Sequence, residues 1–338
     1  MRLWIDLANS PHVPFFKALA ARFVERGHEI ETTARAFAET VPLAHAAGFK
    51  PHVVGAHGGR QVSVKAGNLM SRAWSLATWA RKRQFDLAIS HNSYSQILAA
   101  RCLGIRSVTL MDYEYQPANH LAFRLTSRII VPASFPARRL RRYGASVGKV
   151  RRYHGTKEDV YLADFQADPS FAKELCELGV RPDNVLVLMR PPAHDALYHR
   201  FQNKLFDEAL ALLLARNNVQ VVLLPRNEQQ RATYSPRAGD RLIVPAKPLD
   251  GANLIAASDL VISAGGTINR EAAALGVPVA SVYAGAWAAV DEELVKEGRL
   301  KRIATPGDLR TLTVAKKQSY QPRRASAVID EIVNLIFE

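Results

Sequence analysis

The chain has 338 residues, of which 48% are hydrophobic and 22% charged, a composition typical of a folded globular protein and unlike that of a low-complexity or disordered chain. Its length suits two domains, each large enough to bury a core of its own. With 45 Lys and Arg against 31 Asp and Glu, the formal net charge is +14, which favours an anionic partner without indicating a fold.

The start of the chain and its cysteines indicate a compartment. The N-terminus, MRLWIDLANS, reaches Asp6 after one basic residue and lacks the pattern of a signal peptide. No apolar run reaches the roughly 18–20 residues that cross a bilayer. Cys102 and Cys176 lie far apart in helical contexts, which argues against a disulfide framework. We therefore expect a cytoplasmic protein in a reducing compartment.

Apolar runs typical of buried strands alternate with helical periodicity in the first half of the chain. The predicted strands are residues 2–6, 86–90, 107–111 and 128–132. The predicted helices are residues 14–26, 36–47, 66–84 and 93–103. Gly27, Gly48 and Gly104 are predicted to end helices, as C-terminal glycines do.

The second half repeats this alternation. Its predicted strands are residues 185–189, 219–225, 241–245, 259–263 and 277–283. Its predicted helices lie near residues 203–216, 251–257, 267–275 and 287–297. Continuously apolar strands that alternate with helices predict an α/β fold, in which parallel sheets are covered by helices on both faces.

A loss of apolar periodicity near residues 155–170 predicts two doubly wound, Rossmann-like domains, residues 1–160 and 161–318. Residues 319–338 contain a last predicted helix, 325–337, which we expect to pack back towards the first domain. Ligands of such sheets bind beyond the carboxyl ends of the strands, which predicts a site in a cleft between the domains.

A glycine pair follows one of these strands. Strand 259–263 leads through Ala264, Gly265 and Gly266 into a helix that starts near Thr267. Glycines allow close approach of a ligand, and a helix start offers N–H groups and a positive dipole end. Glu271 follows Thr267 by one helical turn and can accept both hydroxyls of a ribose. These residues favour a diphosphate site; a tight βα turn with a surface Glu is the alternative.

Residues 247–283, KPLDGANLIAASDLVISAGGTINREAAALGVPVASVY, resemble the nucleotide-sugar half of the GT-B glycosyltransferases and of the related UDP-N-acetylglucosamine 2-epimerases. The resemblance implies that the glycine pair and Thr267 hold a diphosphate and that Glu271 holds the ribose. It also implies that the loop at 245–249 cradles the base, with Lys247 and Leu249 flanking it.

Polar residues also follow the first strand. Asn9, Ser10 and His12 lie in a proline-containing loop that leads into a helix. A His at a helix start beside a cleft can act as a general base near neutral pH; a His that caps the loop by a hydrogen bond is the alternative. The loop resembles one in the peptidoglycan N-acetylglucosaminyltransferase, with Asn9 and Ser10 in place of its glycines and His12 in the position of its His.

The strand at 107–111 ends in a pair of acids, Asp112 and Glu114. Paired acids at a strand end favour general-base work or binding of sugar hydroxyls, and a solvated turn is the alternative. Residues 111–134 resemble a segment of the same transferase, which implies that Glu114 faces the acceptor and that Asn119 lies on the following helix.

Two further strand ends carry polar side chains. His91 and Asn92 close strand 86–90 and are candidate acceptor-side residues. Strand 185–189 runs into Arg190, whose guanidinium is suited to bind phosphate, with a surface Arg as the alternative. This region resembles one in the 2-epimerases that carries a His-Arg pair. In this chain Met189 occupies the position of that His, and His194 is a candidate to replace it.

Basic side chains gather in residues 138–152, RRLRRYGASVGKVRR, which hold seven of them, and around Trp74 and Trp79. Peripheral contact with anionic lipid is one interpretation, and a solvated basic face is the other. We expect no nucleic-acid partner, since no nucleic-acid motif appears. We expect no metal, since the histidines at 45, 52 and 57 form no ligand set.

From end to end, the chain resembles the prokaryotic family named domain of unknown function 354, whose members share a GT-B-like plan. Together these observations predict a glycosyltransferase that takes a sugar from a nucleoside-diphosphate sugar without a cofactor. Arg190 would offset charge on the leaving group, and His12 or Glu114 would deprotonate the acceptor. A nucleotide-sugar 2-epimerase, with Asp112 and Glu114 as acid/base groups, and a non-catalytic nucleotide-sugar-binding protein are the alternatives.

Overall fold

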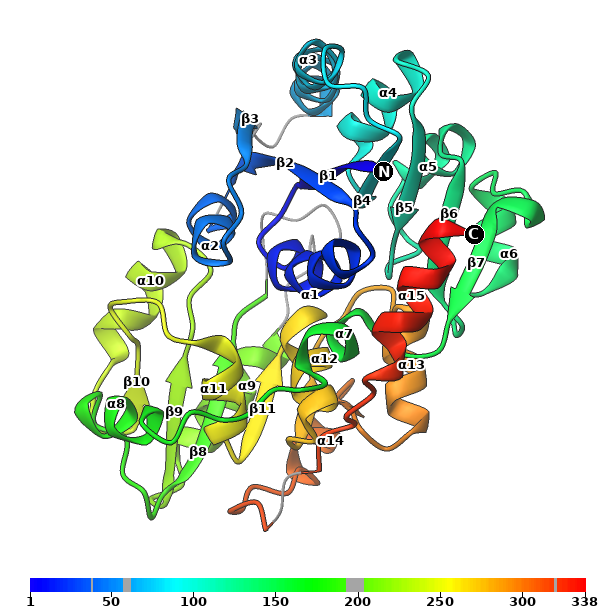
Figure 1. The fold of residues 1–338 in the computed structure, drawn as a ribbon. Helices are drawn as coiled ribbons and strands as arrows, with labels where there is room; N and C mark the ends of the chain where they lie inside the picture. Colours follow the sequence, from blue (N-terminus) through cyan, green and yellow to red (C-terminus); the bar gives the residue numbers. More distant parts are fainter. Residues whose placement is uncertain (38, 57–61, 193–203, 319–320) are drawn as a thin grey trace. The chain divides into compact units, whose positions relative to one another are not determined.

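The computed structural model describes residues 1–37, 39–56, 62–192, 204–318 and 321–338 (Figure 1). His57 and His194, named above, lie outside these ranges. The chain divides into two compact units. The first comprises Met1–Tyr161, Ala288–Val290 and Ala325–Glu338, and the second comprises Leu162–Trp287 and Asp291–Arg324.

A seven-stranded parallel sheet forms the centre of the first unit, in the order β3-β2-β1-β4-β5-β6-β7. Its strands are β1 (Arg2–Leu7), β2 (Glu29–Ala36), β3 (His52–Ala56), β4 (Leu87–His91), β5 (Arg106–Leu110), β6 (Arg128–Pro132) and β7 (Val150–Tyr153). The strand order reverses at β1 and β4, and this is where ligands of doubly wound sheets bind.

Helices cover both faces of this sheet. They are α1 (His12–Glu25), α2 (Thr40–Ala46), α3 (Val62–Ala80), α4 (Tyr94–Cys102), α5 (Asn119–Leu125), α6 (Ala137–Arg142), α7 (Lys157–Leu162) and α15 (Ala327–Phe337). Because side chains of a strand alternate between faces, Leu3 and Ile5 join the core beneath α1 and α15, whereas Trp4 packs in the core that includes Leu76 of α3.

The second unit contains a six-stranded parallel sheet in the order β10-β9-β8-β11-β12-β13. Its strands are β8 (Val185–Arg190), β9 (Val219–Leu223), β10 (Leu242–Ile243), β11 (Leu260–Ser263), β12 (Val279–Ser281) and β13 (Lys301–Arg302). The remaining helices are α8 (Phe171–Glu177), α9 (Lys204–Leu214), α10 (Glu228–Tyr234), α11 (Gly251–Ala257), α12 (Thr267–Leu275), α13 (Ala289–Lys296) and α14 (Pro306–Arg310).

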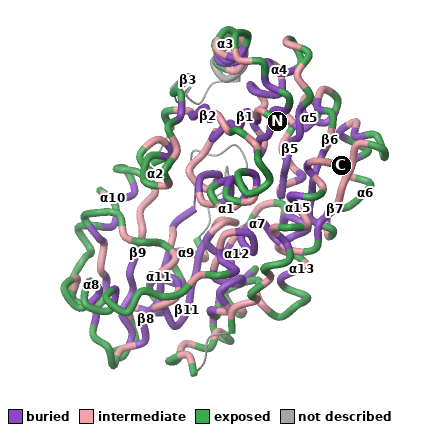
Figure 2. The backbone as a smooth tube through the Cα atoms, in the orientation of Figure 1, coloured by how far each residue is buried: buried purple, intermediate pink, exposed green. Residues whose placement is uncertain are grey.

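The predicted fold class is confirmed: each unit is a doubly wound, Rossmann-like parallel sheet. The central strands are buried, as Figure 2 shows. Several strands near the sheet edges escaped prediction, namely β2, β3, β7 and β13. The reason is visible in β2, whose sequence EIETTARA interrupts apolar residues with charged ones because part of the strand is exposed. A search for continuously apolar runs detects only strands buried on both faces.

Three glycines of the first unit end helices, as predicted. Gly27, Gly48 and Gly104 have φ angles of 75°, 86° and 71°, which confirms that they end helices in the left-handed conformation. Among the described residues, no helix is both long and apolar enough to cross a membrane.

Candidate functional site

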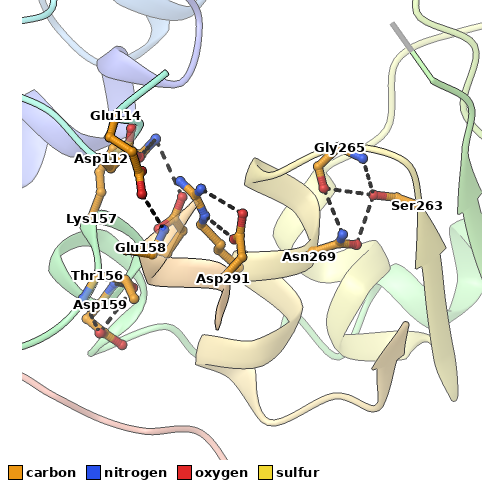
Figure 3. Close-up of polar contacts among 12 residues, drawn as sticks. Asp112, Glu114, Thr156, Lys157, Glu158, Asp159, Ser263, Gly265, Asn269 and Asp291 are labelled. Atoms are coloured by element: carbon orange, nitrogen blue, oxygen red, sulfur yellow. Dashed lines mark hydrogen bonds and ion pairs between the residues drawn. The ribbon is translucent and has the colours of Figure 1, made fainter. Parts of the chain in front are cut away.

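In the second unit, hydrogen bonds from two side chains stabilise the glycine turn between β11 and α12. The Ser263 hydroxyl donates to Asn269 Oδ1 over 2.8 Å, and Asn269 Nδ2 donates to the Gly265 carbonyl over 2.7 Å (Figure 3). The Gly265 amide in turn donates to Ser263 Oγ over 3.2 Å. Ser263 and Asn269 are 0% and 2% exposed, so buried side chains fix the turn. The sequence interpretation did not include either residue.

The start of α12 is suited to an anion. Gly266 occupies the N-cap and brings no side-chain acceptor, and the first helical turn contains no acidic residue. The positive end of the helix dipole is therefore not neutralised by an acid on its own first turn. Gly265, Gly266 and Thr267 are each half-buried, as is Glu271 one turn further along the helix.

Arg190 lies beside this turn at the end of β8, where it is the register partner of Ser263 in β11. Burial lowers the pKa of Arg190, and the negative charge of Glu271 opposes that shift. Its Nε is buried and has no hydrogen-bond partner among the residues that the structure describes. A half-buried cation whose Nε donor is buried and unpaired favours an anionic ligand at this point.

Sequence reasoning missed a second arginine at the same end of the sheet. Arg226 follows β9, and its Nη2 lies 2.6 Å from the position that a Cβ atom on Gly265 would occupy. The signal was present, because Arg226 follows an apolar strand as Arg190 does. Lys247 and Leu249, predicted to flank a base, lie in the loop between β10 and α11, where Lys247 is exposed and Leu249 half-buried.

In the first unit, four buried groups gather beyond the carboxyl ends of β1, β4 and β5. The ring centroids of His12 and His91 are 4.9 Å apart. His91 Nε2 lies 3.7 Å from Asp112 Oδ1, and Lys157 Nζ lies 3.2 Å from Asp112 Oδ2. The structure thus brings together the predicted His12, His91 and Asp112 and adds Lys157, which the sequence interpretation did not include.

The environment of His12 keeps its imidazole neutral. Burial lowers the pKa of His12 well below its usual value, and charges on His91 and Lys157 lower it further, while Asp112 opposes the shift. The side chain is 8% exposed, and its Nδ1 has no hydrogen-bond partner within the described part of the chain. A neutral imidazole can accept a proton, which is what a general base requires.

Other predicted acceptor-side residues make contacts inside this unit. Glu114 is 2% exposed, and its Oε1 accepts a hydrogen bond from the Ala289 amide over 2.9 Å. Asn119 is the first residue of α5 and accepts from the Tyr94 hydroxyl over 3.1 Å. Glu114 and Asn119 therefore each make a hydrogen bond that the sequence did not indicate.

The loop residues have local partners as well. Asn9 Oδ1 accepts from the Ser10 amide over 2.9 Å, and Ser10 Oγ lies 3.3 Å from Thr40 Oγ1. Asn92 has a φ of 56°, a left-handed conformation that Asn tolerates better than most residues, and this turns the chain sharply after β4.

A buried ion pair supports the same end of the sheet. Asp6, the second-last residue of β1, accepts two hydrogen bonds from Arg72, over 2.9 and 2.8 Å. Ser93 and Thr33 also donate to this carboxylate. Burial tends to raise the pKa of Asp6, but the charge of Arg72 and these hydrogen bonds outweigh it, and the pKa is lowered.

Internal contacts also occupy part of the basic region at residues 138–152. Arg139 Nη2 donates to the Tyr115 hydroxyl over 3.1 Å, Arg151 pairs with Glu338 over 2.9 Å, and Arg152 donates to two backbone carbonyls. For metals, the described residues contain no group of three or more His, Cys, Asp or Glu that could hold an ion.

Comparison with known proteins agrees with this architecture. An uncharacterized protein of Methanocaldococcus jannaschii is 27% identical over 342 residues, which cover 99% of this chain and 96% of that protein. The UDP-GlcNAc 2-epimerase of the same organism, solved in complex with UDP-GlcNAc and UDP, matches with a TM-score of 0.76 at 14% identity, covering 100% of this chain and 99% of that chain.

A spinosyn rhamnosyltransferase matches with a TM-score of 0.59 at 14% identity, covering 100% of this chain and 92% of that chain. At such identities the likeness shows a shared fold, and the GT-B-like fold expected from the sequence is confirmed. The family described as "Protein of unknown function (DUF354)" matches residues 1–338, and the chain belongs to this family.

Proposed function

We propose that the protein is a GT-B-type glycosyltransferase that transfers a sugar from a nucleoside-diphosphate sugar to an acceptor hydroxyl. The observation that carries the proposal is the start of α12, where a glycine turn and an acid-free first helical turn lie beside the half-buried side chain of Arg190. Helix N-termini and arginines are the groups that bind phosphates.

The second unit would hold the donor. Gly266 and Thr267 at the start of α12 would bind the diphosphate, with Gly265 in the turn before them, and Glu271 would accept the ribose hydroxyls. As the bond between the sugar and the diphosphate breaks, negative charge develops on the leaving group. The helix dipole and Arg190 would stabilise that charge, which is the task that a metal ion performs in other transferases.

The first unit would activate the acceptor. The depressed pKa of His12 keeps the imidazole neutral at physiological pH, so it can accept the proton of an acceptor hydroxyl as the oxygen forms its bond to the sugar. Asp112, held by Lys157, carries the charge that counters the imidazolium formed in this step. Glu114 is the second candidate base in this proposal.

The proposal is tested by thermal shift with UDP, GDP, CDP and dTDP. A ligand that binds only the native state raises stability, by about 2.7 kcal/mol at a hundred times its Kd. We expect one diphosphate to raise the Tm of the wild type and to raise it less in Glu271→Gln and in Arg190→Met. Glu208→Gln, an exposed acid on α9, is the matched control. A Tm that none of the four diphosphates changes would refute the proposal.

A second candidate is a nucleotide-sugar 2-epimerase, which the higher TM-score of the epimerase, 0.76 against 0.59 for the rhamnosyltransferase, favours. Against it, Met189 occupies the position of the epimerases' His and is 0% exposed within the apolar core. Incubation with UDP-GlcNAc and no acceptor distinguishes the two, since an epimerase alone yields a new UDP-sugar. Nucleotide binding without turnover of any sugar would indicate a binding protein instead.

A further inference from the structure

Arg226 contacts the ends of three neighbouring strands in the second unit. It follows β9 in sequence, and its Nε donates to the carbonyl of Pro191, which follows β8, over 2.7 Å. Its Nη2 lies against Gly265, which follows β11. A Cβ atom on Gly265 would be 2.6 Å from this Nη2. Because β9, β8 and β11 are adjacent in the sheet, this guanidinium lies where the carboxyl ends of the central strands meet.

The backbone around Arg226 is held in place. Its amide donates to Gln230 Oε1 over 2.9 Å, and Gln230 Nε2 donates to the Pro192 carbonyl over 2.7 Å. Gln230 is 7% exposed, and its own amide donates to the side chain of Asn227, the N-cap of α10. The loops that follow β8 and β9 are therefore tied together, which limits how far the arginine can move.

We propose that Arg226 is a second phosphate-binding arginine of the nucleotide site and that Gly265 is a glycine because its missing side chain admits this guanidinium. The inference rests on the proposed function, since it assigns a contact to the same nucleotide diphosphate. One donor of this guanidinium bonds to the Pro191 carbonyl. The planar fork of an arginine suits phosphate oxygens, which it binds in pairs.

This assigns Gly265 a different role from the one predicted by its sequence motif. The motif interpretation has the glycine admit the phosphate itself, whereas the structure places an arginine end group at that position. Nη2 is the end of a flexible side chain, so an alanine methyl at residue 265 would displace the guanidinium and leave the backbone in place. We therefore expect Gly265→Ala to fold with nearly the wild-type Tm and to bind nucleotide poorly because Arg226 has moved.

A double-mutant cycle tests this coupling. The Kd values of UDP and of uridine are measured by calorimetry for the wild type, Arg226→Ala, Gly265→Ala and the double variant. Arg226→Ala should raise the Kd of UDP about tenfold to a hundredfold, as expected for a lost charged hydrogen bond, and should leave the Kd of uridine unchanged. Gly265→Ala should lose UDP affinity to a similar extent, and the double variant should lose no more than Arg226→Ala alone.

Gly239→Ala is the matched control, because a Cβ on Gly239 meets no atom within 4 Å. Losses that add in the double variant would show that the methyl itself blocks the phosphate, and would overturn the role given to Gly265. Unchanged UDP binding by Arg226→Ala, at wild-type Tm, would overturn the role given to Arg226. Should Arg226→Ala unfold, Arg226→Lys replaces it in the cycle, since it keeps the stem and loses the fork.

The failure of this inference is distinguishable from that of the proposed function. A wild-type protein that binds none of the four nucleoside diphosphates refutes the proposed function, and the inference with it. A wild-type protein that binds UDP, combined with an Arg226→Ala variant that binds it equally well, refutes only the inference.

Discussion

Asp6 and Arg72 illustrate how single residues set the stability of the first unit. Asp6 is 0% exposed and Arg72 is 7% exposed, so neither charge is solvated by water. Arg72→Met should destabilise the unit by about 3–5 kcal/mol, because it leaves a buried carboxylate without its cation. The double variant with Asp6→Asn should recover part of this loss. Urea unfolding measures the free energy of unfolding of both variants, with Arg81→Met, a substitution of an exposed arginine, as control. If Arg72→Met lost no more free energy of unfolding than Arg81→Met, the prediction would be contradicted.

His12 makes a pH-dependent contribution at the same scale. Its pKa in the folded state is lowered, chiefly by burial, so below the unfolded value of about 6.5 the unfolded chain binds a proton that the folded chain does not. The stability associated with neutral His12 is present above that value and is lost as pH falls below it. Between neutral and mildly acidic pH, the His12→Asn variant should lose less free energy of unfolding than the wild type. Chemical denaturation at the two pH values measures this, and equal losses in the two proteins would refute the prediction.

At the scale of elements, the end of α12 depends on contact with a distant segment. Gly276 is the left-handed C-cap of the helix, with a φ of 75°. A Cβ on Gly276 would lie 2.1 Å from the backbone oxygen of Gln321, and Arg323 N donates to the Ala274 carbonyl over 2.8 Å. The segment around residues 321–323 therefore packs directly on the helix end.

Alanine substitution of two glycines distinguishes the effect of backbone strain from the effect of packing between residues 321–323 and the end of α12. Gly276→Ala must displace backbone and should lower the free energy of unfolding of the second unit by several times the roughly 1 kcal/mol expected for conformational strain alone. Gly179→Ala is the matched variant, because Gly179 has a φ of 90° and open space around it. Chemical denaturation of the two variants gives the comparison, and similar losses would show that the contact with Gln321 is unimportant.

At the scale of the whole molecule, the first unit is discontinuous in sequence. The chain leaves it after Tyr161, contributes Ala288–Val290 and re-enters at Ala325, and α15 then packs against α1, β6 and β7. Val328, Ile332, Val333 and Ile336 are each at most 4% exposed in the core. Arg128 also donates to the carbonyls of the last helical turn.

Removal of residues 325–338 should therefore destabilise the first unit severely. Four buried aliphatic side chains at about 1.5–3 kcal/mol each amount to about 6–12 kcal/mol, comparable with the stability of a whole domain. We expect residues 1–161 alone to expose apolar surface and aggregate, and the same fragment joined through a flexible linker to 325–338 to stay in solution with a cooperative unfolding transition. Equal solubility and cooperativity of the two fragments would contradict this assignment.

The sequence by itself determined the features that short segments encode. Continuously apolar runs predicted the central strands, glycines predicted helix ends, and the contiguous stretch from Gly265 to Glu271 predicted a candidate phosphate site. These patterns are readable because the physical cause, burial on both faces of a sheet or a left-handed turn, acts on neighbouring residues. The polar, partly exposed β2 escaped prediction because pairing with a neighbouring strand, and not its own pattern, makes it a strand.

Only the tertiary structure decided which distant side chains meet. Lys157 approaches Asp112 from 45 residues away, and Arg226 approaches Gly265 from a different strand end. The Glu114 carboxylate accepts a hydrogen bond from the Ala289 amide, 175 residues away in sequence. Hydrogen bonds and packing of this kind depend on distances in space, which the order of residues along the chain does not contain until the sheets and helices have been assembled.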